Sequence, residues 1–597
     1  MICRYYQMSQ PAVEKQAMLQ VSRKWFGMHR RELVKKVDHQ VWQRVDHAKD
    51  PDSTDLPAAA AAAAAASIPS DFALPGGRVA QRSAAAAAPA PTASAGGGRA
   101  RLEETVGPSL VTVDFHRPFS INGILASRYR GTAVVVDASI GLAVVDRNTV
   151  PSALGDVSLT FANADRVNGS VVFVHPLHNF AFVRYDPAEV TVPVTAATFA
   201  PGEAGGLKSG DRAWLLGLCS DRLDAASSTS IVCRQTRVDK IGWQKLPTPQ
   251  PPRYQQANLE LIRLQDAVKS DGGVIATDNG AVAGLWASFF YQRASGGRGG
   301  ATESQFHSGV PAEVIAETAV PLAAWIKAGG DNGQSSDRLA SYALGANLEP
   351  ISMAMARQLG LAQAVQDGAG VPPQKSALVV SRVWAGTAAN KDGGAGLEPG
   401  DVLLAVGDER PPATMRAVER AVSSAAAAGA PCVAVEVLRG RQRRALSILP
   451  TRLDGLCSAA TEGDRLVFWM GLLVQPPPLA LQTQRGLAPQ GAYVSCRYPG
   501  SPAGSGPGPT CRILEVDGQP TPDLDGFLAA VRPRASPAGE ELSATALTSC
   551  RVKYVELTGS IKMATIKLDP RYWATGELRM TQSGWRRVDF DLKPPVA

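Results

Sequence analysis

Residues 267–289 read AVKSDGGVIATDNGAVAGLWASF. Residues 269–273 are typical of a tight turn, because adjacent glycines adopt backbone conformations that other residues resist. The apolar run at 274–276 predicts a short strand, and a second turn at 278–280 leads into another apolar run at 281–289. An Asn-Gly pair between two apolar runs is a strong hairpin signal. The stretch therefore predicts a glycine-rich turn that feeds a β-hairpin.

Short β-rich runs recur around this hairpin, between residues 100 and 330. They lie at 110–113, 132–136, 142–145, 157–161, 169–174, 213–217 and 230–233. Many short strands at this spacing, with turns between them, predict an all-β barrel or sandwich. Residues 311–327 carry apolar residues at helical spacing despite Pro321, so we expect a helix that closes this domain.

Two weakly similar units follow the barrel-like domain. The first module, residues 337–454, has expected strands at 377–383, 402–406 and 433–438 and an expected helix at 414–428. The second module, residues 455–570, repeats this order with strands at 491–496 and 511–516 and a helix at 524–531. A recurring order of elements is typical of tandem modules.

The ends of the chain differ in composition from these domains. Residues 1–50 are mixed and charged and too short to hold a core, so we interpret them as the remnant of an upstream domain. Residues 51–99 are mostly Ala, Pro, Ser and Gly without an apolar stripe, which predicts a flexible linker. Residues 571–597 are expected to form a C-terminal tail.

The bulk composition argues against several classes of protein. The net charge of +7 is spread along the 597 residues, apart from clusters at 441–444 and 586–587, so we expect no nucleic-acid partner. The eight cysteines show neither paired nor zinc-finger spacing, which favours reduced thiols inside the cell and argues against a metal site. No apolar run is long enough for a membrane span, and the N-terminus lacks the apolar core of a signal peptide.

Together these features resemble the long, double-protease Deg/HtrA serine proteases of plants and fungi. Four pieces carry the resemblance: GLAVVDRNTV at 141–150, HPLHNFAFVRYD at 175–186, AVAGLWASF at 281–289 and YWATGELRMTQSGWRR at 572–587. The resemblance implies a mainly β chain with α+β modules, in which a degenerate trypsin-like two-barrel domain at 100–330 precedes two PDZ-like domains. It also implies that the chain corresponds to the C-terminal half of such a protein.

Catalysis in that family requires a serine nucleophile, a histidine base and an acid that orients the histidine. The resemblance puts Asn148 at the place of the histidine and Asn179 at the place of the acid. The nucleophile's place falls on Asp271, or on Gly272 if the alignment shifts by one residue. An amide cannot accept the proton at neutral pH, so we expect no catalytic residues here and lean against enzymatic activity for this chain.

A shifted triad is the alternative to a loss of catalysis. Ser270 lies beside the nucleophile's place, and His175, His178 and His307 lie in the same domain. Such a triad needs both a displaced serine and a histidine from another strand, and triad geometry tolerates little displacement. The competing interpretation is that His175 and His178 are structural residues at a junction of loop and strand.

The PDZ-like modules imply a positive function. Such domains bind a C-terminus or an extended segment by β-augmentation, and the backbone N–H groups of a short loop hold the carboxylate. The peptide-binding residues are expected to be Tyr342, Leu344, Gly345, Ala346 and Val418 in the first module and Met470, Gly471 and Leu472 in the second. The alternative is that the chain itself closes one or both grooves, which would then serve only to pack domains together.

The sequence therefore predicts a non-catalytic portion of a Deg/HtrA-type protease that binds peptide or protein C-termini in protein quality control. The family also implies a possible homo-oligomer, no cofactor and an intracellular location, with nucleus and chloroplast both open. Two rival hypotheses remain. One is an active serine endopeptidase, if the natural chain carries an upstream protease domain or a rearranged triad. The other is a chaperone-like holdase that uses the apolar pocket of the barrels.

Overall fold

The computed structural model covers the chain in separate described ranges that begin after residue 92. The described ranges are 93–121, 127–220, 229–266, 270–293, 302–330, 339–361, 376–390, 395–455, 465–532, 549–569, 572–581 and 584–590. They lie in the second of two compact units, Ala90–Ala597. The expected remnant at 1–50 and residues 51–92 of the expected linker lie outside the described residues.

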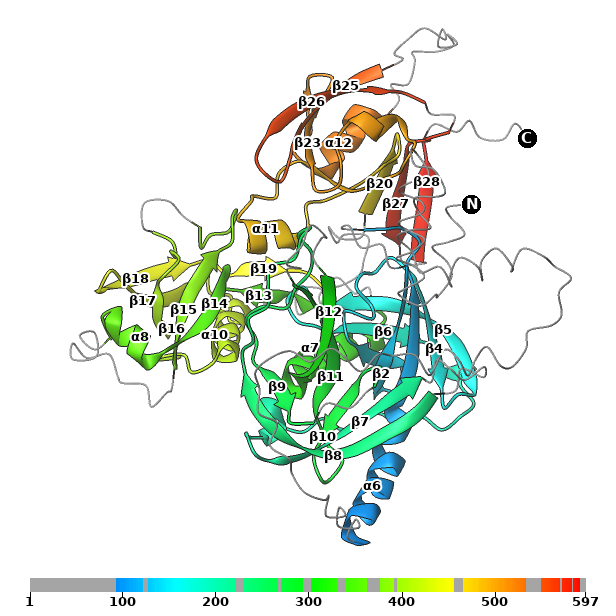
Figure 1. Ribbon diagram of the computed structural model, residues 1–597, viewed down its shortest axis with the longest axis vertical. Helices are drawn as coiled ribbons and strands as arrows, with labels where there is room; N and C mark the ends of the chain where they lie inside the picture. Colours follow the sequence, from blue (N-terminus) through cyan, green and yellow to red (C-terminus); the bar gives the residue numbers. More distant parts are fainter. Residues whose placement is uncertain are drawn as a thin grey trace, which may run out of the picture. The chain divides into compact units, whose positions relative to one another are not determined.

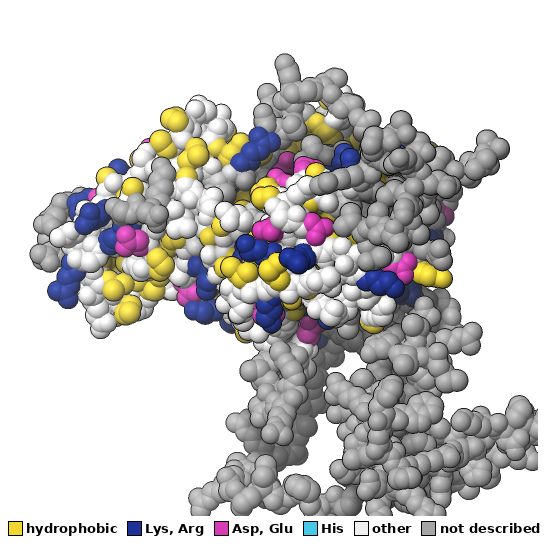
Figure 2. Space-filling view, turned by 90° about the horizontal axis from the view of Figure 1, so that it is seen from above, with side chains coloured by type: hydrophobic (Ala, Val, Ile, Leu, Met, Phe, Trp, Pro, Cys, Tyr) yellow, Lys and Arg dark blue, Asp and Glu magenta, His cyan; other side chains and the backbone are white. Residues whose placement is uncertain are grey.

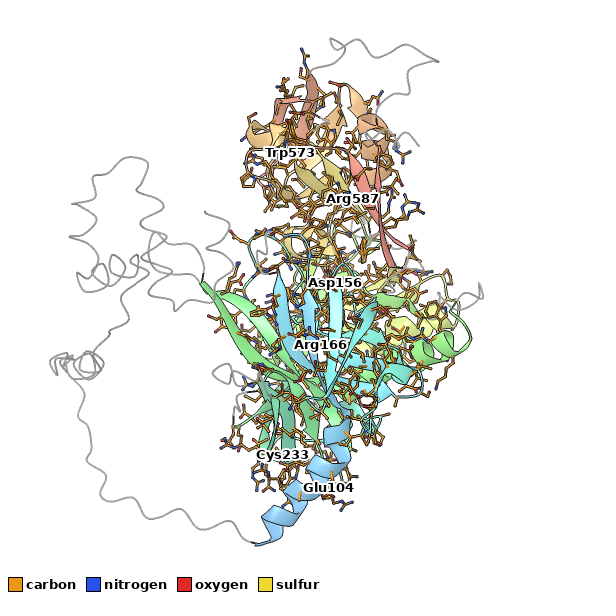
Figure 3. The ribbon with its side chains drawn as sticks, turned by 90° about the vertical axis from the view of Figure 1, so that its right-hand side faces the viewer. Glu104, Asp156, Arg166, Cys233, Trp573 and Arg587 are labelled. Carbon is orange, nitrogen blue, oxygen red and sulfur yellow. The ribbon has the colours of Figure 1, made fainter. Side chains whose placement is uncertain are left out.

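A helix replaces the last part of the expected linker. Residues 93–99 begin α6 (Ala93–Val106), which ends in the 3₁₀ turn η1 (Gly107–Ser109). Leu102 and Val106, four residues apart, lie on one face of α6 and are buried in the core. Helix α6 packs against the barrel strand that contains Cys233, and Figure 3 labels Glu104 on the helix and Cys233 on that strand.

The first barrel is closed by six strands in the order β1-β2-β3-β6-β5-β4 (Figure 1). These strands are β1 (Leu110–His116), β2 (Arg128–Asp137), β3 (Leu142–Val145), β4 (Asp156–Phe161), β5 (Asp165–Val174) and β6 (Ala181–Tyr185). Alternate residues of β1, among them Val111, Val113 and Phe115, point into the barrel core. The short turn η2 (Pro187–Glu189) follows β6.

The second barrel is also closed, in the order β10-β11-β12-β9-β8-β7. Its strands are β7 (Arg212–Ser220), β8 (Thr229–Gly242), β9 (Leu261–Leu264), β10 (Gly273–Ala276), β11 (Val282–Arg293) and β12 (Thr302–Pro311). The turn η3 (Glu203–Gly206) precedes it, and the expected helix α7 (Ala312–Lys327) follows it. The two barrels confirm the predicted fold class.

The hairpin predicted at 274–289 is β10–β11. Gly280 donates its N–H to the Thr277 carbonyl at 3.0 Å and has a φ of 87°, as a tight turn with glycine at this position requires. One apolar cluster contains buried side chains of both barrels, such as Phe182 of the first barrel and Leu285 of the second. The two barrels therefore share a core at their junction.

The described residues of the first module form a five-stranded antiparallel sheet, a two-stranded sheet and two helices. The larger sheet has the order β14 (Ala346–Ser352), β15 (Ser376–Val383), β16 (Val402–Val406), β17 (Val433–Arg439) and β18 (Gln442–Ile448). The smaller sheet pairs β13 (Ser341–Ala343) with β19 (Thr451–Leu453). The helices are α8 (Met353–Gln358) and α10 (Met415–Ala427), and Thr414 caps α10 by accepting the Ala417 N–H.

The second module repeats this order in a single sheet, β26-β25-β23-β22-β21-β20-β27-β28, with β24 paired to β23. The strands are β20 (Arg465–Trp469), β21 (Leu472–Gln475), β22 (Ala492–Arg497), β23 (Arg512–Val516), β24 (Gln519–Pro520), β25 (Ser549–Val555), β26 (Ile561–Lys567), β27 (Gly576–Thr581) and β28 (Gly584–Asp589). The helical elements among its described residues are α11 (Leu479–Arg485), η5 (Pro502–Ser505) and α12 (Leu524–Val531).

The expected tail belongs to the second module. Residues 576–589 form the hairpin β27–β28, which pairs with β20 and so extends the module's sheet beyond residue 570. Leu578 pairs with Leu466 and packs with it in one apolar cluster, and Trp585 packs against that cluster. Burial of these apolar residues explains why this segment joins the sheet.

Many surface charges are balanced locally. On the face shown in Figure 2, dark blue Lys and Arg side chains are interspersed with magenta Asp and Glu side chains. Within the first module, Arg410 and Arg443 pair with Glu436, while Arg439 pairs with Asp401. None of the helices in the described part of the chain combines the length and the apolar character needed to cross a membrane.

We predict that Gly471→Ala destabilises the second module far more than Gly500→Ala. Both glycines have φ near 80°, but a Cβ at Gly471 would lie 2.0 Å from the Ser501 Cβ, whereas a Cβ at Gly500 meets nothing within 4 Å. We expect a loss of about 3 kcal/mol for Gly471→Ala and about 1 kcal/mol for Gly500→Ala, measured by guanidinium denaturation with tryptophan fluorescence. Equal losses would contradict a steric role for Gly471.

Candidate functional site

The two asparagines at the triad positions meet on one backbone carbonyl. Asn148 lies in the turn after β3, and Asn179 lies two residues before the start of β6. Asn179 Nδ2 donates to the Ser288 carbonyl of β11 at 2.7 Å, and Asn148 Nδ2 donates to the same oxygen. Asn179 Oδ1 also accepts the Arg147 N–H at 3.0 Å. The structure therefore brings both positions together in hydrogen bonds that connect the two barrels.

A buried aspartate completes this join. Asp146 Oδ1 accepts the Thr149 N–H at 2.6 Å, and Asp146 Oδ2 accepts both the Ser288 N–H and the Ser288 hydroxyl at 3.1 Å. Sequence analysis missed Asp146, although an aspartate three residues before a threonine at the end of a strand is typical of a capped turn. The main chain of Ser288 thus has polar partners from three residues of the first barrel.

Asp271 at the nucleophile's place is also used structurally. Its Oδ2 accepts the Ser220 N–H at 2.9 Å and the Ser220 hydroxyl, and its own N–H donates to the Leu218 carbonyl at 2.7 Å. The glycines that follow have positive φ, and a Cβ at Gly273 would lie 2.1 Å from the Leu216 carbonyl oxygen. The turn keeps the backbone conformation that its glycines allow. The Asp271 carboxylate accepts hydrogen bonds from Ser220, the last residue of β7.

The shifted triad is not assembled among the described residues. Ser270 is buried, and its hydroxyl has no hydrogen-bond partner in the described part of the chain. His307 lies opposite Ser288 across the β11–β12 ladder and stacks on Trp286, with ring centroids 6.0 Å apart. Burial lowers the pKa of His307, although Asp146 and Asp271 oppose this effect. The described residues therefore include no hydrogen bond between the His307 imidazole and the Ser270 hydroxyl, which a shifted triad would need.

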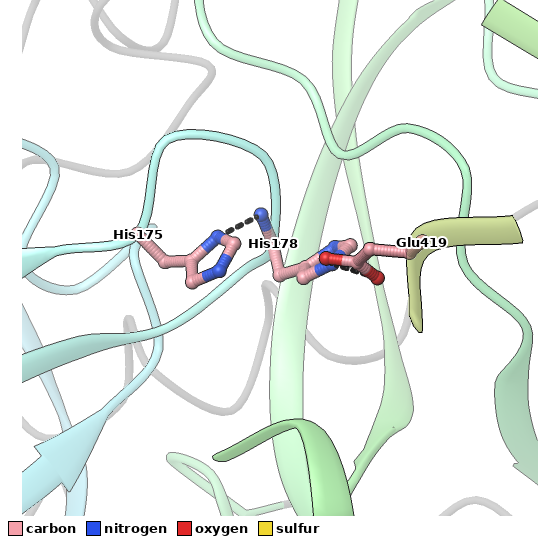
Figure 4. A group of neighbouring side chains, drawn as sticks. All are labelled: His175, His178 and Glu419. Carbon is pink, nitrogen blue, oxygen red and sulfur yellow. Dashed lines mark hydrogen bonds and ion pairs between the residues drawn. The ribbon is translucent and has the colours of Figure 1, made fainter. Parts of the chain in front are cut away.

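His175 and His178 form a stacked pair beside helix α10, as Figure 4 shows. His175 Nδ1 accepts the N–H groups of Leu177 at 3.2 Å and His178 at 2.8 Å. His178 Nε2 lies 2.9 Å from Oε1 of Glu419 on α10. Both histidines are buried, so they are structural residues at a junction of loop and strand that also contacts the first module.

This cluster does not fit a metal site, although its ligand atoms lie within 4.8 Å of one another. A neutral imidazole carries a proton on one nitrogen and a free lone pair on the other. Nδ1 of His175 accepts two backbone N–H groups, so the proton lies on Nε2 and no lone pair is left for a metal. The two rings also stack at 20°, so their in-plane lone pairs do not converge.

The cluster is part of an ion-pair network between the barrels and helix α10. Arg416 donates to Glu419 at 2.7 Å and also pairs with Glu317 of α7. Burial alone would raise the pKa of the Glu419 carboxyl, but the charge and hydrogen bond of His178 and the charge of Arg416 hold it well below its usual range. Burial, followed by the charge of His178, holds the pKa of His175 well below 6.5.

The residues predicted to bind peptide in the first module lie around one apolar cluster. Leu344, Ala346 and Val418 belong to that cluster, and Tyr342 of β13 packs against it. Gly345 has a φ of 79°, and a Cβ there would lie 2.9 Å from the Thr387 hydroxyl. The loop, the strand and the helix named from the sequence are therefore neighbours, and the peptide-binding role itself stays a prediction.

The second module differs at the corresponding strand. Met470 and Gly471 form the turn between β20 and β21, and Leu472 begins β21. One side of β21 pairs with β22 and the other side pairs with β20. A peptide could add to β21 only if β20 detached, so the predicted role of these three residues would require that rearrangement.

Two closed six-stranded barrels, joined at the triad positions, define a trypsin-like chain with two α+β modules. No family model matches the chain.

Protease Do-like 7 of Arabidopsis thaliana is 30% identical over 516 residues, which cover 81% of this chain and 44% of that relative. The pro-apoptotic serine protease NMA111 of Phaeosphaeria nodorum is 27% identical over 489 residues, covering 80% of this chain and 43% of the relative. The chain belongs to the Deg/HtrA protease family with PDZ domains.

The chain spans less than half the length of these curated relatives. Among solved structures, HtrA-type protease AlgW with decapeptide is 16% identical, with a TM-score of 0.36, and the match covers 60% of this chain and 98% of that structure.

We predict that the stability of the protein falls as the pH drops below 6.5 and that His175→Asn reduces this dependence. The unfolded state takes up a proton on His175 near pH 6.5, whereas the folded state resists it, so acid favours unfolding. The contribution is up to about 1.4 kcal/mol per pH unit. Asparagine keeps an acceptor for the Leu177 and His178 N–H groups without a titratable ring.

Urea denaturation at pH 7.0, 6.0 and 5.0 measures this dependence. His116→Asn, which removes a partly exposed histidine at the end of β1, is the matched control. An unchanged pH dependence in His175→Asn would show that the neutral ring of His175 does not contribute.

Proposed function

We propose that this chain is a non-catalytic portion of a Deg/HtrA-type protease that binds peptide or protein C-termini and supports assembly in protein quality control. The observation that carries the loss of catalysis is the use of all three triad positions in structural hydrogen bonds. Asn148 and Asn179 both donate to Ser288, and Asp271 accepts from Ser220. None of these groups can supply the base or nucleophile of acyl transfer in this arrangement.

The binding role is supported by the first module. Its strand β14 lies at the end of the five-stranded sheet, next to the loop that contains Gly345. An edge strand beside a glycine-containing loop is the arrangement that β-augmentation uses, since the edge supplies main-chain hydrogen bonds and the loop holds a carboxylate. Val418 of α10 packs in the same cluster as Ala346 of β14, which puts strand and helix on either side of the proposed site.

The proposed setting is the interior of a cell. The cysteines in the described part of the chain, Cys219, Cys233, Cys432, Cys496, Cys511 and Cys550, are all free. Burial raises the pKa of Cys233 to about 11 and of Cys550 to about 12, which keeps these thiols protonated and unreactive. Free thiols are typical of a reducing compartment. Assembly into a homo-oligomer is proposed from the family alone.

We predict that the purified 597-residue chain does not degrade β-casein and does not react with a fluorophosphonate probe. Ser270→Ala should behave as the wild type, because the Ser270 hydroxyl has no hydrogen-bond partner among the described residues that could activate it. An active serine protease in the same assay controls for probe and substrate. Cleavage that Ser270→Ala abolishes would favour the rival hypothesis, an active endopeptidase with a rearranged triad.

We predict that the chain binds peptides with a free C-terminal carboxylate at least tenfold more tightly than the same peptides with a C-terminal amide. The reason is that loop N–H groups hold a charged carboxylate better than a neutral amide. The probes are the members of a random hexapeptide library, and fluorescence anisotropy measures the affinity of the chain for each peptide in its carboxylate and amide forms. Hydrogen exchange should show protection of residues 346–352 on binding, with residues 472–475 as the matched control strand. Protection of 472–475 alone would move the site to the second module.

A further inference from the structure

The connection between β8 and β9, residues 243–260, lies against both elements that would frame a peptide in the first module. At β14, Lys245 Nζ lies 2.9 Å from Glu349 Oε2. At α10, Glu260 Oε1 accepts the N–H of Met415, the first residue of the helix, at 2.8 Å. Trp243 packs against the apolar cluster that contains Leu344, Ala346 and Val418. The β8–β9 connection therefore contacts strand and helix on the side proposed for peptide binding.

One side chain of this connection occupies the outer edge of β14. Asn258 Nδ2 donates to the Ala346 carbonyl at 2.7 Å, and Asn258 Oδ1 accepts the Leu348 N–H at 2.8 Å. Ala346 and Leu348 are two residues apart, so their outward main-chain groups are the ones that a neighbouring strand would use. The side-chain amide of Asn258, with one donor and one acceptor engaged, takes the place of a peptide unit of an added strand.

The backbone around Asn258 is shaped for this contact. Asn258 has a φ of 54°, in the left-handed region that asparagine tolerates better than most residues. Two residues further on, the Glu260 carboxylate is buried, and burial raises its pKa although the backbone N–H of Met415 opposes this. A buried acid fixed on the first N–H groups of a helix anchors the connection beside α10.

The same connection is also attached to the triad positions. Gln256 Oε1 accepts the Asn179 N–H at 2.8 Å, and the Arg147 guanidinium lies 3.7 Å from the centre of the Tyr254 ring. Gln256, Asn258 and Glu260 are alternate residues of one short segment. The first of them bonds the barrel junction, and the other two bond the first module.

We propose that Asn258 is an internal occupant of the peptide-binding edge of β14, and that an extended peptide binds the first module by displacing it. This inference rests on the proposed peptide-binding function. The exchange is feasible because a bound peptide forms several main-chain hydrogen bonds along β14, whereas Asn258 forms two, each of modest net strength. Affinity for peptides is therefore set in part by the β8–β9 connection.

The test compares Asn258→Gly with Asn163→Gly in the full chain. Glycine keeps the positive φ of Asn258 but removes the amide. Asn163 is a matched control, because it has a φ of 59° and its amide also engages one main-chain N–H and one carbonyl of a strand, both of Thr229, at 3.0 and 2.6 Å. The probe is the tightest-binding member of a random hexapeptide library with free C-terminal carboxylates.

We expect Asn258→Gly to bind this peptide at least about fivefold more tightly than the wild type, and Asn163→Gly to bind as the wild type does. Without peptide, residues 346–352 should exchange hydrogen faster in Asn258→Gly. Asn258→Asp keeps the acceptor for the Leu348 N–H but loses the donor to the Ala346 carbonyl, so it should show a smaller gain in peptide affinity. If Asn258→Gly does not fold, Asn258→Asp takes its place in the comparison.

Equal affinity of Asn258→Gly and the wild type would overturn this inference and leave the proposed peptide binding intact. Weaker binding by Asn258→Gly would also overturn it, since Asn258 would then support the bound state. If no library peptide binds any of the variants, the proposed function fails and this inference fails with it.

Discussion

The main chain of Ser288 carries the hydrogen bonds that connect the two barrels at the triad positions. Its carbonyl accepts from Asn148 and Asn179, and its N–H donates to Asp146, so one residue of β11 binds three residues of the first barrel. Ser288 is buried, and a buried peptide group left without partners costs about 1–3 kcal/mol. A catalytic triad needs polar groups that can exchange protons during a reaction. At this junction the corresponding groups are engaged in permanent structural bonds, and the same contacts join the barrels.

Much of the fold followed from local sequence patterns, because strands and turns leave local signals. The hairpin at 274–289, the helix α7 and the order of elements in both modules were predicted and confirmed. The resemblance to the Deg/HtrA proteases put Asn148 and Asn179 at the triad positions, and the structure brings the two residues together on the Ser288 carbonyl. Asp146 and Asn258 were missed, because their partners lie 142 and 90 residues away along the chain. The pairing of β27 with β20 was missed for the same reason.

The two modules show how one arrangement can lead to different binding properties. In the first module a single side chain, Asn258, covers the outer edge of β14 with two hydrogen bonds. In the second module the strand β20 pairs along β21 from Trp469 to Val467 and is itself paired with β27. Displacing one amide costs far less than removing a strand from the interior of a sheet. This asymmetry is the physical reason to favour the first module as the peptide-binding site.

Both walls of that proposed site are fixed to the barrels by polar contacts. Helix α10 is bound through Glu419 to His178 and through Arg416 to Glu317, and strand β14 is bound through Asn258. His178 is adjacent in the chain to Asn179, whose N–H is bonded by the same β8–β9 connection that contains Asn258. A peptide that moves this connection therefore changes contacts at the triad positions. In the proposed function the barrel pair acts as a rigid support, and its contacts with the β8–β9 connection and α10 determine how easily the first module opens.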